Sequence, residues 1–170
     1  MHIQIVDEAH NRVDWAASTP LVKVLLGLFA GWGILAVLLL PGPGPRTYLV
    51  GGVAGGAVLL FALLMALTTP LSERGHLERT PEGGEVYRLK RWLLAGKRMT
   101  WYAPLEDVSG FQMEWQTFEE TSAATYTLAR LWVVLTDGST ALLTDWADVD
   151  HVRGLGELLA KAGRRVFEEG

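Results

Sequence analysis

The sequence predicts an α+β membrane protein, in which an N-terminal two-helix transmembrane hairpin is followed by an antiparallel β-sheet or barrel and a C-terminal α-helix. Three observations predict this. Two long apolar runs lie in the first part of the 170-residue chain. Short alternating runs with turn residues between them follow, and the apolar period then becomes helical near the end. We therefore expect a segment 1–19, a hairpin 20–70 and a domain 71–170.

Residues 1–19 have no decisive pattern. The apolar residues fit a helical spacing from Ile3 to Val13, but Ile3 and Ile5 also fit a strand. Trp15 is of a type that is common at membrane interfaces. We expect an interfacial segment, and the alternative is a strand added to the domain that follows.

The two apolar runs, 21–40 and 47–69, are each bounded by prolines. At 1.5 Å per residue, helices over these runs would measure about 30 and 35 Å, and the hydrocarbon core of a bilayer is about 30 Å thick. The loop 41–46 contains three prolines and is short, so the two helices should be antiparallel. The distribution of basic residues favours a multi-pass protein of the cell (plasma) membrane with both termini in the cytoplasm.

Glycines recur at four-residue spacing in both runs, and missing side chains let helix backbones approach closely. If the helices meet at the loop, Gly31 faces Gly56 and Gly33 faces Ala54. We predict that these glycines form the contact within the hairpin. The alternative is a contact with a partner helix or a second copy. The glycines concerned are Gly27, Gly31, Gly33, Gly51, Gly52, Gly55 and Gly56.

After residue 70 the pattern changes to about six antiparallel strands followed by one helix. Asp137-Gly138 is the strongest hairpin signal in the chain. Apolar residues at helical spacing predict a helix over 149–163, with Asp148 as its N-cap and Gly163 near its end. The expected strands are 75–80, 85–93, 97–102, 108–117, 124–136 and 139–144.

This order resembles the pleckstrin-homology-like (PH-like) domains of small bacterial membrane proteins, in which two transmembrane helices precede a curved sheet capped by a C-terminal helix. The layout is also similar to that of the photosystem I assembly factor of chloroplasts and cyanobacteria. The resemblance implies a nonenzymatic role in binding or assembly. The segments that carry it are 79–87, 91–92, 97–98, 105–108, 131–138 and the final helix.

Composition excludes several classes of function. The net charge is −4, and the acidic excess lies after residue 69, which argues against nucleic-acid binding. The chain has no cysteine, so thiolate metal sites and cysteine nucleophiles are excluded. Its four histidines have no metal-ligand spacing, and Asp145, Asp148 and Asp150 fit a helix start better than a calcium loop. We expect no cofactor, no metal and no enzymatic activity.

Basic and aromatic residues alternate around one expected turn between two strands. Such a turn could dock on anionic lipid headgroups or on an acidic partner surface. The alternative is a solvated strand face. The residues concerned are Arg88, Lys90, Arg91, Trp92, Lys97, Arg98 and Trp101.

The sequence thus favours a non-catalytic integral membrane accessory or assembly protein that binds a membrane-protein partner through its helical hairpin and its PH-like domain. One alternative is an anionic lipid headgroup sensor that uses the basic turn. Another is a small oligomeric channel or transport subunit. The expected partners are membrane lipids and another integral membrane protein or a second copy. Most of the five tryptophans after residue 70 should be core residues, and an exposed aromatic side chain near basic residues would mark a protein interface.

Overall fold

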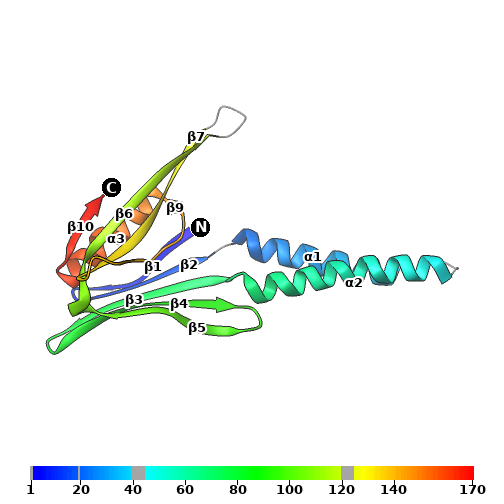
Figure 1. Ribbon diagram of the computed structural model, residues 1–170, viewed down its shortest axis with the longest axis horizontal. Helices are drawn as coiled ribbons and strands as arrows, with labels where there is room; N and C mark the ends of the chain where they lie inside the picture. Colours follow the sequence, from blue (N-terminus) through cyan, green and yellow to red (C-terminus); the bar gives the residue numbers. More distant parts are fainter. Residues whose placement is uncertain (1, 19, 40–44, 120–124) are drawn as a thin grey trace. The chain divides into compact units, whose positions relative to one another are not determined.

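The computed structural model describes residues 2–18, 20–39, 45–119 and 125–170. Over these residues the chain forms two sheets, three α-helices and one short 3₁₀-helix, which is an α+β fold (Figure 1). Contacts divide the chain into two units. The sheet unit contains Met1–Ser18, Ser72–Lys90 and Arg98–Gly170, and the helical unit contains Thr19–Leu71 and Arg91–Lys97.

The first sheet has the strand order β1-β2-β3-β4-β5. Its strands β2 and β3 are antiparallel neighbours, paired from Arg12 opposite Glu78 to Ser18 opposite Ser72. Residues 19–71 are therefore an insertion between two adjacent strands, and the N-terminal residues form two strands of the sheet. The strands are β1 (His2–Ala9), β2 (Arg12–Ser18), β3 (Ser72–Thr80), β4 (Gly83–Trp92) and β5 (Gly96–Pro104).

The side chains of β2 explain why the N-terminal segment joins the sheet. Val13, Trp15 and Ala17 alternate with half-buried residues and are almost fully buried. Gly75 of β3 lies directly opposite Trp15, and a Cβ atom at Gly75 would lie 1.8 Å from the indole ring. Because Gly75 has no side chain, the indole covers its backbone. The pair makes Trp15 a core residue rather than a residue of a membrane interface.

The second sheet has the strand order β10-β6-β7-β8, and β9 pairs with β7 beside β8. The last strand, β10, runs parallel to β6, from Val166 opposite Gly110 to Glu169 opposite Met113. The 3₁₀-helix η1 (Leu105–Asp107) connects the first sheet to the second. The strands are β6 (Val108–Glu119), β7 (Thr125–Leu135), β8 (Thr140–Leu142), β9 (Ala147–Asp148) and β10 (Val166–Glu169).

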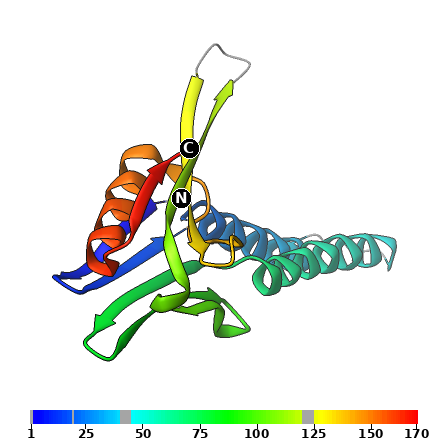
Figure 2. The ribbon, with the colours of Figure 1, turned by 60° about the vertical axis from the view of Figure 1, so that its left-hand side comes forward.

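Helix α3 (Val149–Gly163) packs against strands of both sheets and completes the core of the sheet unit (Figure 2). Its bounds are those that the sequence predicts. The Asp148 carboxylate accepts hydrogen bonds from the backbone N–H groups of Asp150 and His151, which confirms the predicted N-cap. Leu155 and Leu159 on its inner face are fully buried.

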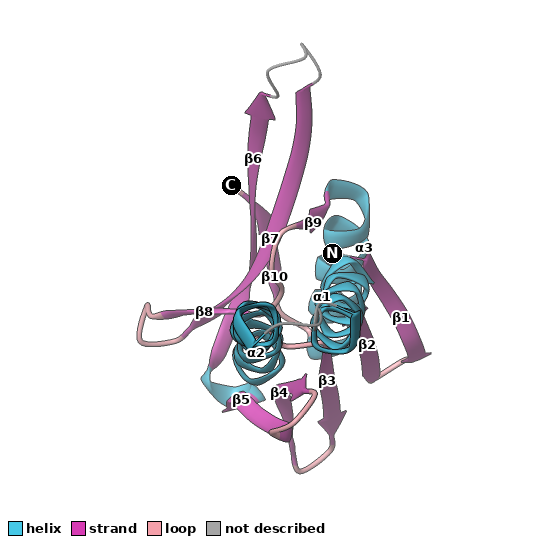
Figure 3. Cartoon of the chain, turned by 90° about the vertical axis from the view of Figure 1, so that its right-hand side faces the viewer, coloured by secondary structure: helices cyan, strands magenta, loops and turns pink. Residues whose placement is uncertain are grey.

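The helical unit is an antiparallel pair of helices, α1 (Pro20–Leu39) and α2 (Pro45–Thr68), seen end-on in Figure 3. Phe29 and Phe61 meet edge to face, with ring centroids 5.2 Å apart. The segment 91–97 between β4 and β5 belongs to the same unit. Within it, Trp92 Nε1–H donates a 3.3 Å hydrogen bond to the carbonyl oxygen of Thr68.

The predicted transmembrane hairpin is wrong. Across the described residues, the structure contains no helix whose length and apolar character would suffice for a bilayer crossing. This finding also contradicts the predicted multi-pass location in the cell membrane. The sequence predicts helices over the complete runs 21–40 and 47–69. Residues 40–44, which include most of the predicted loop 41–46, lie outside the described residues.

The predicted β domain needs three further corrections. Instead of one sheet capped by a helix, the described residues form two sheets with α3 packed against both. The predicted strand 139–144 is shorter, since β8 contains only Thr140–Leu142. After it, Leu143 N–H and Thr144 N–H both donate to the carbonyl oxygen of Leu131, which ends the regular ladder. The strand β10 was not predicted, because its four residues contain two glutamates and little alternation.

Candidate functional site

The β6–β7 hairpin is longer than the strands that flank it. The two strands pair along their whole length, to Glu119 opposite Thr125. Among the described strands, β10 pairs with β6 only at residues 110–113 of β6. Strands β8 and β9 pair with β7 only within residues 128–134 of β7. Residues 114–119 and 125–127 therefore form a two-stranded ribbon, which extends beyond the other strands of its sheet (Figure 3).

One face of this hairpin carries a row of aromatic side chains around one arginine. Alternation in β7 places Tyr126, Arg130 and Trp132 on the face opposite that of the buried Leu131 and Val133. The partners on β6 follow from the register, with Glu114 opposite Arg130 and Phe118 opposite Tyr126. We call this set the aromatic–arginine stripe, and its members are Glu114, Phe118, Tyr126, Arg130, Trp132 and Trp146.

The arginine of the stripe is held between two indole rings. The guanidinium carbon of Arg130 lies 4.7 Å from the ring centroid of Trp132 and 4.6 Å from that of Trp146. Both are cation–π distances. Trp146 comes from the segment between β8 and β9, so two separate parts of the chain hold one side chain.

Glu114 fixes the same arginine from the neighbouring strand. Arg130 Nε and Nη2 donate hydrogen bonds of 2.8 and 2.9 Å to the two carboxylate oxygens, and Trp132 Nε1–H donates one of 2.8 Å. The bonds from Arg130 and then Trp132 lower the pKa of Glu114. The carboxylate is therefore ionised at neutral pH, and it orients both the guanidinium and the indole.

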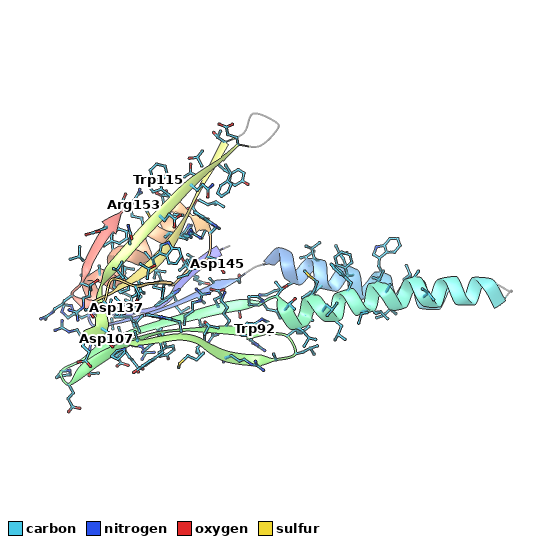
Figure 4. The ribbon with its side chains drawn as sticks, viewed as in Figure 1. Trp92, Asp107, Trp115, Asp137, Asp145 and Arg153 are labelled. Carbon is cyan, nitrogen blue, oxygen red and sulfur yellow. The ribbon has the colours of Figure 1, made fainter. Side chains whose placement is uncertain are left out.

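The far end of the stripe is aromatic and partly exposed. Phe118 stacks on Tyr126 with ring centroids 5.4 Å apart, and meets Trp146 edge to face at 5.8 Å. The exposed fraction of Tyr126 is 46%. On the other face of the same hairpin, Trp115 is 53% exposed (Figure 4). The ribbon thus presents aromatic surface on both faces.

The predicted basic cluster is divided by the structure. Arg88 and Lys90 lie on the inner face of β4 and form a buried ion cluster with Glu73. Lys90 Nζ lies 2.7 Å from Glu73 Oε1 and 3.4 Å from Asp145 Oδ2, and Arg88 Nη1 donates a 2.5 Å hydrogen bond to the carbonyl oxygen of Leu142. Figure 4 marks the position of Asp145. Burial raises the pKa of Glu73, although the hydrogen bond from Lys90 and the charge of Arg88 act against it.

The other members of that cluster do not join this group. Arg91 and Lys97 are exposed residues of the helical unit, and Trp92 bonds to Thr68 within it. Arg98 and Trp101 belong to the sheet unit, where Arg98 is exposed and Trp101 packs against the core. Three basic side chains of the predicted five are therefore at the surface.

The predicted helix-packing glycines also have different surroundings. A Cβ at Gly33 would lie 2.7 Å from the side chain of Leu59, so Gly33 lies at the α1–α2 contact. A Cβ at Gly27, Gly31 or Gly56 would meet no atom within 4 Å, so these three lie on open faces. Gly55 is buried, and Gly51 and Gly52 lie outside the residues whose surroundings are described. A contact of the open glycines with another helix stays a prediction.

One histidine has close partners that sequence spacing did not indicate. His76 Nδ1 lies 2.5 Å from Asp14 Oδ1 and its Nε2 lies 3.4 Å from Glu78 Oε2, and its ring stacks on Tyr87 with centroids 4.9 Å apart. Burial opposes ionisation of Asp14, but hydrogen bonds from His76 and Arg12 outweigh it and lower the pKa. Both ring nitrogens of His76 have carboxylate neighbours, so the group holds adjacent strands together.

Within the described ranges, no group of three or more histidine, aspartate and glutamate side chains is arranged to hold a metal ion. Asp148 caps α3, Asp145 pairs with Lys90, and Asp150 pairs with Arg153, so the three aspartates that were considered as a calcium loop have separate roles.

The sequence did not predict the aromatic–arginine stripe, although one part of the stripe has a recognisable sequence pattern. The alternation of Tyr126, Arg130 and Trp132 marks one face of a strand. Nothing local to that strand indicates that Trp146 lies over it. Among known proteins, no family model matches the chain, and no curated protein matches it significantly. The site must therefore be judged from its geometry.

Proposed function

We propose that this chain is a non-catalytic protein-binding module, whose aromatic–arginine stripe and adjoining ribbon edge receive an extended segment of another protein. One observation carries the proposal. Arg130 is held between Trp132 and Trp146 beside a ribbon that β10, β8 and β9 do not flank. Tryptophan, tyrosine and arginine dominate the binding energy of protein interfaces. A strand edge offers backbone groups to an incoming strand.

Burial of the exposed aromatic side chains would favour the binding of a partner to this surface. Tyr126 and Trp115 are about half exposed. An aromatic side chain buries about 150–250 Å² in full, so covering the exposed half removes about 100 Å² from water. At about 25 cal/mol per Å² this corresponds to about 2.5 kcal/mol for each residue, before the costs of association. The held arginine adds little ordering cost on binding, because its rotamer is already fixed by Glu114 and two rings.

The test compares two tyrosines of similar exposure. A photo-crosslinking residue is placed at Tyr126 or at Tyr102 of β5, which is 49% exposed, in the full chain in its source cells. We expect a protein adduct at position 126 and none at position 102. Binding of the purified partner should weaken at least about tenfold in Tyr126→Ser, which is about 1.4 kcal/mol, and should not change in Tyr102→Ser.

A second variant tests the arginine itself. Arg130→Lys keeps the positive charge and loses the planar group that stacks between the rings. We expect weaker partner binding with an unchanged sheet unit. Adducts to lipid alone at position 126, or equal binding by Tyr126→Ser and the parent chain, would contradict the proposal.

A further inference from the structure

The helical unit contains an apolar groove that the proposed function does not use. It has a volume of about 540 Å³ and is bounded by α1, α2 and the segment 91–97. Small residues of the two helices, among them Gly27, Ala62 and Ala66, form the hollow. Leu93 and Leu94 flank it and are more than half exposed. Its volume lies within the range of about 300–1,000 Å³ that is usual for small-molecule sites.

Among the described residues that line the groove, Lys23 is the one charged residue and none is acidic. Lysine has a flexible apolar stem and a compact ammonium group, so it can reach an anion at the end of an apolar site. A matching ligand has a single negative group and a long apolar chain. The ammonium group of Lys23 would pair with the negative group of the ligand, and the leucines and small residues would contact its apolar chain.

One other occupant fits less well. A peptide strand carries backbone N–H and C=O groups, which need partners that this apolar lining does not offer.

We propose that the groove binds a free long-chain fatty acid, with its acyl chain between α1 and α2 and its carboxylate at Lys23. The inference is independent of the aromatic–arginine stripe, because all residues of the groove belong to the helical unit. The same chemistry could be supplied by the anionic headgroups and acyl chains of a bilayer surface. The experiment therefore includes both sources.

The experiment measures binding of palmitate, hexadecylamine and methyl palmitate to the full chain by displacement of a fluorescent fatty acid, below the concentrations at which they aggregate. We expect saturable binding of one palmitate per chain, at least tenfold tighter than that of the amine or the ester. Lys23→Met should abolish this preference and keep the weaker binding of the ester.

Two glycines of α1 provide a matched pair of variants. Gly27 lines the groove and Gly31 does not, and an added Cβ meets no atom within 4 Å at either position. Leucine is a better helix former than glycine, so both variants should fold. Gly27→Leu should weaken palmitate binding at least tenfold, and Gly31→Leu should leave it unchanged.

Three results would overturn the proposal. The first is equal palmitate binding by Gly27→Leu and Gly31→Leu. The second is equal affinity for the carboxylate and the amine in the parent chain. The third is flotation with vesicles of phosphatidylglycerol and phosphatidylcholine without any binding of free palmitate, which would assign the groove to a lipid surface. Circular dichroism confirms that the variants keep their helices, and Lys23→Met provides the test if Gly27→Leu does not fold.

Discussion

The contact between Trp15 and Gly75 allows a sharp test of the first sheet. A methyl group at Gly75 would lie 1.8 Å from the indole of Trp15, which is 2% exposed and has no room to move outward. Inserting a methylene into a packed core costs about 1–3 kcal/mol. The overlap here is severe, so we expect Gly75→Ala to cost about 3 kcal/mol. For a chain of this size that corresponds to a fall of about 6–12 °C in Tm.

The matched control is the same substitution in an open position. Gly154 lies within α3, and an added Cβ there would meet no atom within 4 Å. Gly154→Ala should therefore stabilise the chain by about 0.5–1 kcal/mol through helix propensity. Urea denaturation of both variants measures the difference. Replacing glycine by alanine is thus expected to destabilise the chain at position 75 and to stabilise it at position 154.

A double-mutant cycle with Trp15→Leu separates the clash from other effects of the alanine. In the Trp15→Leu background the indole is absent, so Gly75→Ala should cost at least about 1 kcal/mol less than in the parent chain. If Gly75→Ala and Gly154→Ala change the free energy of unfolding by the same amount, the pairing of β2 with β3 through Trp15 is refuted.

Three further predictions concern charged groups. Asp148→Ala removes the N-cap of α3 and should cost about 1 kcal/mol in urea denaturation; an unchanged midpoint would contradict the cap. The pKa of Asp14 is lowered in the folded chain. The stability that the ionised carboxylate contributes is therefore present above the pKa of about 3.9 in the unfolded chain, and is lost as the pH falls through the folded-state pKa. The difference in stability between Asp14→Asn and the parent chain should shrink on acidification. The pKa of Glu73 is raised, so the folded chain loses stability as pH rises from 4.5 through the raised value, and Glu73→Gln should remove that loss. Destabilisation of about 3–5 kcal/mol by Glu73→Gln at neutral pH would show instead that pairing with Lys90 and Arg88 outweighs desolvation.

Local chemistry explains which elements could be predicted from the sequence. Helix α3 depends on a side chain that caps its own first turn and on an apolar period within fifteen residues. The turn at Asp137-Gly138 depends on two residues, and Gly138 has the positive φ of 83° that favours glycine. Both features are encoded where they occur. They were therefore predicted with accurate positions.

Pairing between distant segments has no comparable local signal. Trp15 suits a membrane interface and a sheet core equally well when only its neighbours in the chain are considered. Its environment is decided by Gly75, which lies beyond the whole insertion 19–71. The aromatic–arginine stripe has the same character, because Trp146 reaches Arg130 only through the pairing of β9 with β7. A prediction of either contact needs the sheet order first.

The insertion itself gives a final test of how the sheet unit is built. Ser18 and Ser72 are directly opposite each other at the ends of β2 and β3. An Asn-Gly turn fits two antiparallel strands at such a point. We predict that replacing residues 19–71 by Asn-Gly leaves a folded sheet unit, because its core contains none of the described residues of the replaced segment.

The shorter connection should also stabilise the pairing of β2 with β3. In the flexible-loop relation, closing two residues instead of the insertion lowers the entropic cost by about 3 kcal/mol, and a preformed helix pair reduces this gain. Amide hydrogen exchange would measure the protection of β2 in both chains. Protection of β2 that is equal to or higher than in the parent is expected. Loss of β2 protection in the shortened chain would mean that the helical unit supports the first sheet, and that the insertion is part of its folding rather than an addition to it.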